Sequence, residues 1–366
     1  MTTVAILGAG VMGSALAFPL ADNRHDVRLV GTHLDGEVIE AVRATGVHPG
    51  LGRQLPEPVR PYQVDEIEAA FDGVEIVVSG VNSFGVGWSG RQIAPLLDPG
   101  TLVIAIAKGM AAEQDGNLRL LPDVLAEQTP AELRSRVSWA AIGGPSIAGE
   151  VAARRETCVV FAGHDQAALD RLAAAFRTGW YHVWTSTDMV GVEVSAALKN
   201  CYAFGVGFAE GILDRLGEAE GADRNHNYEA ALFAQATAEI GQMVRLLGGR
   251  PETPYGLAGV GDMFVTSTGG RNIRVGRLVG GGLPFSAARA RMGGVTLEGA
   301  AAIQVIGGAL PRLTERGIVG AADFPLMRHL HAVVAEDAPP AMPWTSFFDG
   351  RATAGVGAER PGHGQR

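Results

Sequence analysis

Lysine is almost absent from this 366-residue sequence: of its 30 basic residues only Lys108 and Lys199 are lysines, and the other 28 are arginines. Arginine keeps its proton at any workable pH, whereas lysine can release one. The two remaining lysines are therefore candidates for positions where arginine fails because the amine must titrate. The alternative interpretations are chance survival and a steric fit that arginine would break.

Other scarcities exclude whole classes of protein. Two cysteines, Cys158 and Cys201, form neither a disulfide framework nor a metal-binding set. A net charge of −9 argues against a nucleic-acid partner, which usually needs a basic face. No apolar run is long enough to insert into a membrane, and the N-terminus lacks the features of a signal peptide. We therefore expect a cytoplasmic protein of two domains.

A strand, a glycine-rich turn and a helix follow one another at the N-terminus. The apolar run 4–7 leads into GAGVMG at 8–13, a helical segment at 14–21 and a second strand at 26–30. This order predicts a dinucleotide-binding fold, in which the glycines let backbone N–H groups approach a pyrophosphate. The second strand ends in Gly-Thr-His-Leu-Asp at 31–35, without an acid at the place that usually binds the ribose 2′-hydroxyl. The sequence thus leans toward NADP or toward no strong choice between the two cofactors, since no arginine lies there to bind a 2′-phosphate either.

Strands and helices then alternate up to residue 185. We predict strands at 74–80, 102–107, 137–142, 158–162 and 181–184, with a helix at 166–176. Lys108 directly follows one strand, and the turn GGPSIAGE at 143–150 follows the next. Ligands of such sheets bind beyond the carboxyl ends of the strands, which favours both segments as binding sites. His25, His33 and His48 fall in predicted loops and are expected at the surface.

The pattern becomes helical after residue 185. We predict a nucleotide-binding domain at 1–185, a helical domain at 186–336 and a Pro/Gly-rich tail at 337–366 that is partly disordered. The apolar segment 192–212 reads as a buried helix with Lys199 in its middle and no acid three or four positions away. Burial should lower the pKa of this amine unless a distant carboxylate counters the effect.

A second dense motif occupies residues 255–272. Asp262 and Thr266 stand four apart, on one face if the segment is helical. Arg271 and Asn272 follow a glycine pair, which suits a guanidinium and an amide around a phosphate. From the local residues alone, a glycine-rich surface loop with Asp262 as a helix cap is an equally good interpretation.

Taken in order, five motifs resemble those of the NAD(P)-dependent sn-glycerol-3-phosphate dehydrogenases. They are GAGVMG at 8–13, AKGM at 107–110, GGPSIAGEV at 143–151, ALKN at 197–200 and GLAGVGDMFVTSTGGRN at 256–272, with a weaker match at 297–299. The similarity covers residues 4–335. It implies an α/β Rossmann-type N-terminal domain and an all-helical C-terminal domain, the 6-phosphogluconate-dehydrogenase-like arrangement, with NADP or NAD and no metal.

The resemblance also implies residue roles for reduction of dihydroxyacetone phosphate to glycerol 3-phosphate, feeding glycerophospholipid synthesis. Lys199 would be the proton donor and acceptor, Lys108 would stabilise charge on the reacting oxygen, and Asp262, supported by Thr266, would hold the lysine. Arg271 and Asn272 would grip the substrate phosphate, aided by Gly144, Ser146 and Gly270. The residues implied around the cofactor are Gly8, Gly10, Val11, Met12, Gly13, Thr32, Lys108, Ala148, Arg271 and Glu298.

Two alternatives stay open at this point. The first keeps the hydride chemistry but changes the substrate to another phosphorylated hydroxyketone or polyol, or to a β-hydroxyacid. The second is a non-catalytic nucleotide sensor, against which the two lysines and Asp262 argue, because a sensor needs no proton donor. Relatives of this kind suggest a homodimer.

Overall fold

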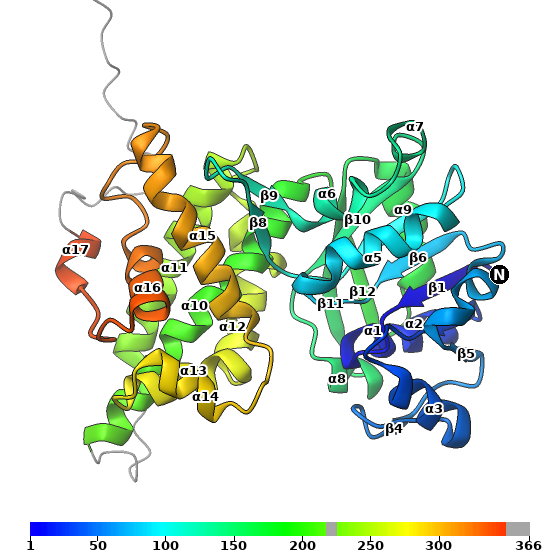
Figure 1. Cartoon of the computed structure of the whole chain (residues 1–366), viewed down its shortest axis with the longest axis horizontal. Helices are drawn as coiled ribbons and strands as arrows, with labels where there is room; N and C mark the ends of the chain where they lie inside the picture. Colours follow the sequence, from blue (N-terminus) through cyan, green and yellow to red (C-terminus); the bar gives the residue numbers. More distant parts are fainter. Residues whose placement is uncertain (217–224, 349–366) are drawn as a thin grey trace, which may run out of the picture.

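A twisted eight-stranded sheet forms the N-terminal lobe of the computed structural model, which describes residues 1–216 and 225–348 (Figure 1). The strand order is β12-β11-β10-β7-β6-β1-β2-β5, and β10 and β11 are the one antiparallel pair in this sheet. The strands are β1 Thr3–Leu7, β2 Asp26–Val30, β5 Val59–Tyr62, β6 Ile76–Ser79, β7 Leu102–Ala105, β10 Ser138–Gly143, β11 Thr157–Gly163 and β12 Tyr181–Ser186.

Helices cover both faces of this sheet, so its central strands read as nearly continuous apolar runs. These helices are α1 Val11–Ala15, α2 Ala17–Asp22, α3 Gly36–Thr45, α4 Ile67–Phe71, α5 Val86–Ile93, α6 Leu121–Ala126, α7 Ala131–Arg134, α8 Ala148–Ala152 and α9 Gln166–Phe176. Two small hairpins extend from the lobe: β3 Val47–His48 with β4 Arg53–Gln54, and β8 Met110–Ala112 with β9 Leu118–Leu120.

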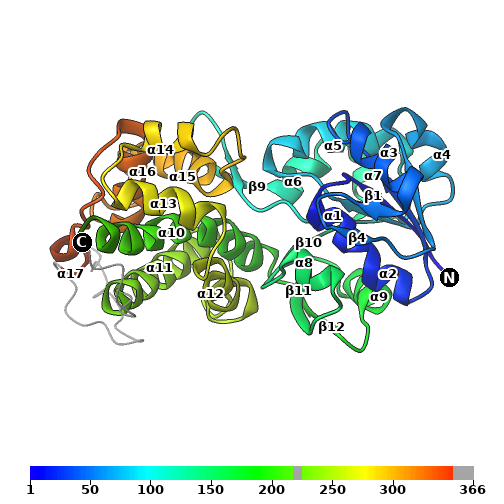
Figure 2. The ribbon, with the colours of Figure 1, turned by 90° about the horizontal axis from the view of Figure 1, so that it is seen from below.

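The C-terminal lobe is helical and is organised around one long buried helix, α10 (Figure 2). Asp188 begins that helix, because its Oδ1 accepts a hydrogen bond from Gly191 N at 3.0 Å. The helices of this lobe are α10 Met189–Leu216, α11 His226–Leu246, α12 Asp262–Ser267, α13 Arg271–Gly280, α14 Phe285–Arg291, α15 Glu298–Glu315, α16 Pro325–Glu336 and α17 Trp344–Phe348.

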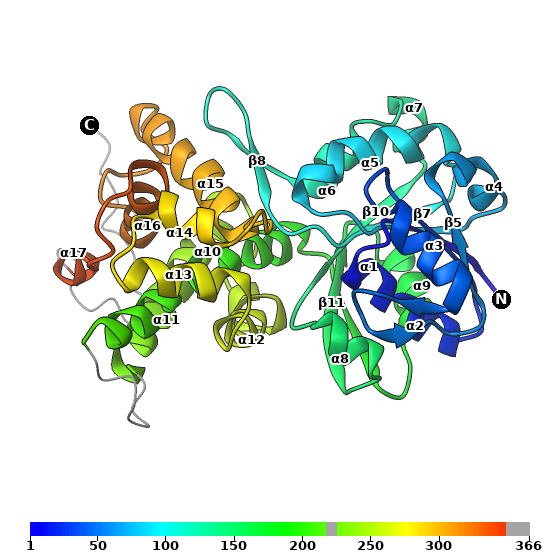
Figure 3. The same cartoon turned by 60° about the horizontal axis from the view of Figure 1, so that its bottom comes forward.

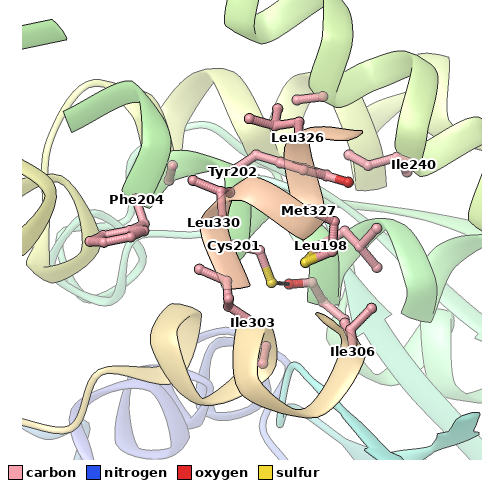
Figure 4. Packing of buried hydrophobic residues seen from close by; sticks show 14 of the residues in the cluster. Leu198, Cys201, Tyr202, Phe204, Ile240, Ile303, Ile306, Leu326, Met327 and Leu330 are labelled. Carbon is pink, nitrogen blue, oxygen red and sulfur yellow. Dashed lines mark hydrogen bonds between the residues drawn. The ribbon is translucent and has the colours of Figure 1, made fainter. Parts of the chain in front are cut away.

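Glycine lets α10 and α13 approach each other closely. A Cβ on Gly207 would lie 2.4 Å from the Ile273 carbonyl oxygen, and one on Gly276 would lie 2.1 Å from the Phe204 carbonyl oxygen. On another face of α10, Leu198 and Cys201 meet Ile303 and Ile306 of α15 (Figure 4). With partners on several faces, α10 buries even its central lysine.

The two-lobed fold confirms the predicted fold class. The predicted Pro/Gly-rich tail begins with described residues, in which Phe347 is buried and the Trp344 ring packs edge-on against Tyr228. Its remainder, residues 349–366, lies outside the described part of the chain. None of the helices within the described ranges combines the length and the apolar character that crossing a membrane requires.

Candidate active site

A cavity of about 740 Å³ lies between the carboxyl ends of the sheet strands and the helical lobe. Segments far apart in the sequence meet in it, including the first glycine turn, the ends of β6, β7 and β10, the middle of α10 and the starts of α13 and α15. Twelve residues predicted for the site line this cavity: Gly8, Gly10, Val11, Met12, Thr32, Lys108, Gly144, Ser146, Ala148, Lys199, Arg271 and Glu298.

The glycine turn at 8–13 is held rigidly from several sides. Gly8 has φ +118°, and a Cβ there would lie 2.8 Å from the backbone of Gly80. A Cβ on Gly13 would lie 2.5 Å from the Gly8 carbonyl oxygen, so Gly13 serves the packing of the turn and does not line the cavity. Around Gly10 a Cβ would meet nothing within 4 Å, which leaves room for a phosphate group beside the turn.

Two side chains that the sequence analysis did not assign brace this turn at Ala9. Asp35 Oδ2 accepts hydrogen bonds from Ala9 N at 3.1 Å and from Thr32 N at 2.9 Å. His48 Nε2 lies 2.9 Å from the Ala9 carbonyl oxygen, and the ring is buried. The expectation that His48 lies at the surface was therefore wrong, because the β3–β4 hairpin carries it under the nucleotide turn.

Aromatic side chains line the end of the cavity beside the second strand. The rings of His33 and Trp88 meet edge-on with centroids 5.2 Å apart, and the Phe84 ring is exposed. Asn82 sets this loop, because its Oδ1 accepts hydrogen bonds from Phe84 N and Gly85 N. These residues come from the segment after β2, the turn after β6 and helix α5, so no local motif identified them. Their flat faces suit a heteroaromatic base at this end.

The two lysines that line the cavity share one carboxylate, that of Asp262. Asp262 Oδ1 accepts a hydrogen bond from Lys199 Nζ, and Asp262 Oδ2 accepts one from Lys108 Nζ at 2.8 Å. The three residues come from α10, the start of α12 and the segment after β7. The Asp262 side chain is 2% exposed, against 6% for Lys199 and 19% for Lys108.

Burial and neighbouring charge make the two amines unequal. Loss of hydration together with the adjacent charge of Lys108 lowers the pKa of Lys199 to about 7. Burial opposes the charge of Lys108 as well, but the Asp262 carboxylate outweighs it and raises the pKa of Lys108. At neutral pH the site thus holds one permanently charged ammonium beside one amine that can give or take a proton.

Comparison with known proteins identifies the family. Residues 3–169 match the model of the NAD-dependent glycerol-3-phosphate dehydrogenase N-terminus, and residues 188–344 match the model of its C-terminus. An NADP(+)-dependent glycerol-3-phosphate dehydrogenase of Archaeoglobus fulgidus is 35% identical over 285 residues, covering 78% of this chain and 82% of that protein. The chain belongs to the NAD-dependent glycerol-3-phosphate dehydrogenase family.

Other relatives agree over nearly the full length. A glycerol-3-phosphate dehydrogenase [NAD(P)+] of Shouchella clausii is 33% identical over 344 residues, covering 93% of this chain and 94% of that protein. The crystal structure of glycerol-3-phosphate dehydrogenase from Coxiella burnetii superposes with a TM-score of 0.76 at 29% identity, covering 94% and 97% of the two chains. Membership of this family makes the chain an oxidoreductase that uses NAD or NADP, as the sequence predicts.

The remaining residues predicted for the site lie around the start of α13. Gly270 has φ +105° and leads into the helix, whose first residue, Arg271, is exposed and lines the cavity. Asn272 lies behind this surface, where its Oδ1 accepts a hydrogen bond from Gly299 N at 3.2 Å and so ties α13 to α15. The backbone N–H groups at the start of α13 and the Arg271 guanidinium together favour an anion.

Thr266 does not contact the Asp262 carboxylate. Its hydroxyl donates to the Asp262 backbone carbonyl at 2.7 Å, so it supports the helical turn that carries the acid. A five-residue π-helical turn, Leu257–Gly261, precedes Asp262, and a Cβ on Gly259 would lie 2.0 Å from the Pro254 carbonyl oxygen. The glycines of this motif thus permit the tight backbone that aims Asp262 at the lysines.

Proposed function

We propose that this chain reduces dihydroxyacetone phosphate to sn-glycerol 3-phosphate with NAD(P)H, in a reversible hydride transfer with Lys199 as the proton donor and acceptor. The observation that supports it most is the Asp262 carboxylate shared between Lys108 and Lys199 at a cavity wall. A ketone that accepts hydride at carbon needs a proton at oxygen, and the two unequal amines supply both a proton and a fixed positive charge.

Each residue has a separate part in this proposal. A reduced nicotinamide held in this cavity would supply the hydride that C2 of the ketone needs. The Lys199 ammonium transfers its proton to the C2 oxygen, which leaves an alcohol and a neutral amine. The Lys108 ammonium stabilises negative charge on that oxygen as the carbonyl bond breaks. Asp262 keeps both amines in place. In the reverse direction neutral Lys199 accepts the hydroxyl proton.

We assign the dinucleotide to the part of the cavity that the first lobe lines. The open side of the 8–13 turn suits the pyrophosphate, and the end of the cavity lined by Thr32, His33 and Trp88 suits the adenosine. We assign the substrate phosphate to Arg271 and the first turn of α13, aided by Gly144 and Ser146, which line the same cavity. Asn272 then contributes indirectly, because its hydrogen bond from Gly299 N fixes the position where α13 begins.

Three broader proposals accompany this assignment. We place the division between the nucleotide-binding and substrate domains at 185/186, just before the last residue of β12 and shortly before α10 begins. We further propose a cytoplasmic homodimer, as the resemblance to the family suggests. Its product would feed glycerophospholipid synthesis.

The decisive experiment follows oxidation of NADPH and of NADH at 340 nm with dihydroxyacetone phosphate as substrate. Unphosphorylated dihydroxyacetone is the control for the phosphate site. We expect oxidation with at least one cofactor, and only weakly with the control. No oxidation with either cofactor would reject the proposed function, and equal rates with the two ketones would reject the phosphate assignment.

A further inference from the structure

The β8–β9 hairpin leaves the nucleotide-binding lobe and packs into the helical one (Figure 3). Met110 and Leu120, at the base of its two strands, are buried in the same apolar core as α10, α13 and α15, and Leu118 packs against that core. The hairpin therefore belongs by sequence to the first lobe and by packing to the second.

Lys108 lies between the two attachments of this segment. On one side, Ile106 N donates to the Ser79 carbonyl oxygen at 3.2 Å, which ties the chain to the sheet just before Lys108. On the other side, Met110 begins β8 inside the helical core. Only a few residues separate these points, so the hairpin controls how far the Lys108 amine can reach toward Asp262.

The tip of the hairpin rests directly on α15. Gly116 has φ +89°, and a Cβ there would lie 3.1 Å from both the Ala309 carbonyl oxygen and Arg312 Cβ. A side chain at this position would therefore push the tip away from the helix, in addition to straining the turn.

A guanidinium at the end of α15 holds the same tip. Arg316 Nη1 donates to the Asp115 carbonyl oxygen at 3.0 Å and to Asn117 Oδ1 at 2.9 Å, and it forms a salt bridge with the Asp115 carboxylate. Asn117 in turn donates through its backbone N and its Nδ2 to the Asp115 side chain. The turn is thus pre-formed for the arginine.

We propose that the β8–β9 hairpin is a strap that holds Lys108 in the helical lobe, with Gly116 and Arg316 as positioning residues for the reaction. This inference rests on the proposed function of Lys108. The strap thereby keeps Lys108 in a fixed position relative to Asp262 and Lys199, which belong to helices of the helical lobe. Motion of the nucleotide-binding lobe then leaves the proton donor and its neighbouring charge undisturbed.

The test is a double-mutant cycle between Gly116→Val and Lys108→Ala, measured as kcat for dihydroxyacetone phosphate reduction. We expect Gly116→Val alone to lower kcat about tenfold, since misplacing a catalytic group by 1 Å can cost about 100-fold. In the Lys108→Ala background the same change should cost less than about twofold, because the strap then has no amine to position. Equal losses in both backgrounds, or no loss in either, would overturn the proposal.

Gly100→Val is the matched control. Gly100 also has a left-handed φ, +92°, but a Cβ there would meet nothing within 4 Å. This control shows whether backbone strain at a left-handed glycine lowers kcat by itself, without displacement of the hairpin tip. The kcat of Gly100→Val should therefore stay within about twofold of wild type. A loss equal to that of Gly116→Val would contradict the role of the α15 contact.

A cross-link tests the strap independently of activity. The Gly116→Cys/Arg312→Cys variant should form a disulfide on mild oxidation, since the two Cβ positions are 3.1 Å apart and need to separate by only about 0.5 Å to reach the Cβ–Cβ distance of a disulfide. Mass spectrometry would locate the bond in the folded protein, whether or not dihydroxyacetone phosphate is a substrate. Failure of wild type to turn over would reject the function alone, whereas failure of the bond to form would reject the strap. The cross-link holds the hairpin tip on α15, which is the position that the strap proposal requires. A cross-linked variant that is inactive when oxidised and active when reduced would therefore also overturn the proposal.

Discussion

Replacing Asp262 by asparagine should move the pH dependence of the reaction strongly toward acid. The change preserves the shape of the side chain and removes the carboxylate that lies between two ammonium groups. In the described part of the chain no other carboxylate forms a salt bridge with Lys108 or Lys199. Both amines would then lose their direct counter-charge while staying in the same buried place.

The size of the effect follows from the burial of the pair. Breaking a buried ion pair costs about 3–5 kcal/mol when the remaining charge stays, which corresponds to roughly 2–4 pKa units. The protein relieves this cost by releasing a proton from Lys199, whose pKa is already about 7. A further drop of about two units would leave roughly 1% of Lys199 protonated at pH 7, against about half in wild type. The rate of ketone reduction at pH 7 should fall about 50-fold.

The assay is kcat for dihydroxyacetone phosphate reduction between pH 4.5 and 8.5, with the melting temperature recorded at each pH. Wild type should lose activity as pH rises through about 7, since neutral Lys199 cannot donate a proton. The Asp262→Asn profile should have its midpoint at least two units lower, with activity partly recovered near pH 5. A folded variant whose midpoint stays within half a unit of wild type would refute the charge arrangement.

Three further changes test other parts of the site. Lys199→Arg should lower kcat about 10²–10⁴-fold, since arginine does not release its proton. The variant should still bind NAD(P)H, as measured by fluorescence. Turnover above a tenth of wild type would contradict the proton-transfer role. Arg271→Ala should raise KM for dihydroxyacetone phosphate far more than for dihydroxyacetone, and equal effects on the two ketones would reject the phosphate contact. Burial raises the pKa of the Glu193 carboxyl to about 8, so the folded state keeps a proton that the unfolded chain releases near pH 4.5, and stability should fall as pH rises between these values. Glu193→Gln should flatten that dependence in thermal melts, and an unchanged slope would contradict it.

The sequence predicts the elements of the nucleotide lobe well where local pattern decides. The strand Asp26–Val30 and the helix Gln166–Phe176 were predicted with the bounds that they have in the structure. Both have regular apolar spacing and sharp turn residues at their ends, so the sequence within each element specifies it. Four of the five motifs lie at a strand end or a helix start and so converge on one cavity, and the fifth, ALKN at 197–200, reaches it from the middle of α10.

Elements that depend on distant partners were missed. The edge strand Val59–Tyr62 is short and contains a proline, and it is a strand only because β2 pairs with it. The β8–β9 hairpin has three-residue strands whose apolar side chains are buried by the other lobe. Asp35 and His48 were missed as braces of the glycine turn for the same reason. Their contacts with Ala9 join segments that no local pattern relates.

The different surroundings of Lys108 and Lys199 explain why lysine is kept at these two positions. One carboxylate binds both amines, yet Lys199 lies deep in α10 while Lys108 is partly exposed at the end of a strand. Environments that push two neighbouring pKa values apart assign the roles of titrating group and fixed charge. At 199 an arginine could bind Asp262 but could not release a proton. At 108 the charge of an arginine would suffice for the proposed reaction, so we propose that this position favours lysine because a compact ammonium would fit between the Asp262 carboxylate and the reacting oxygen.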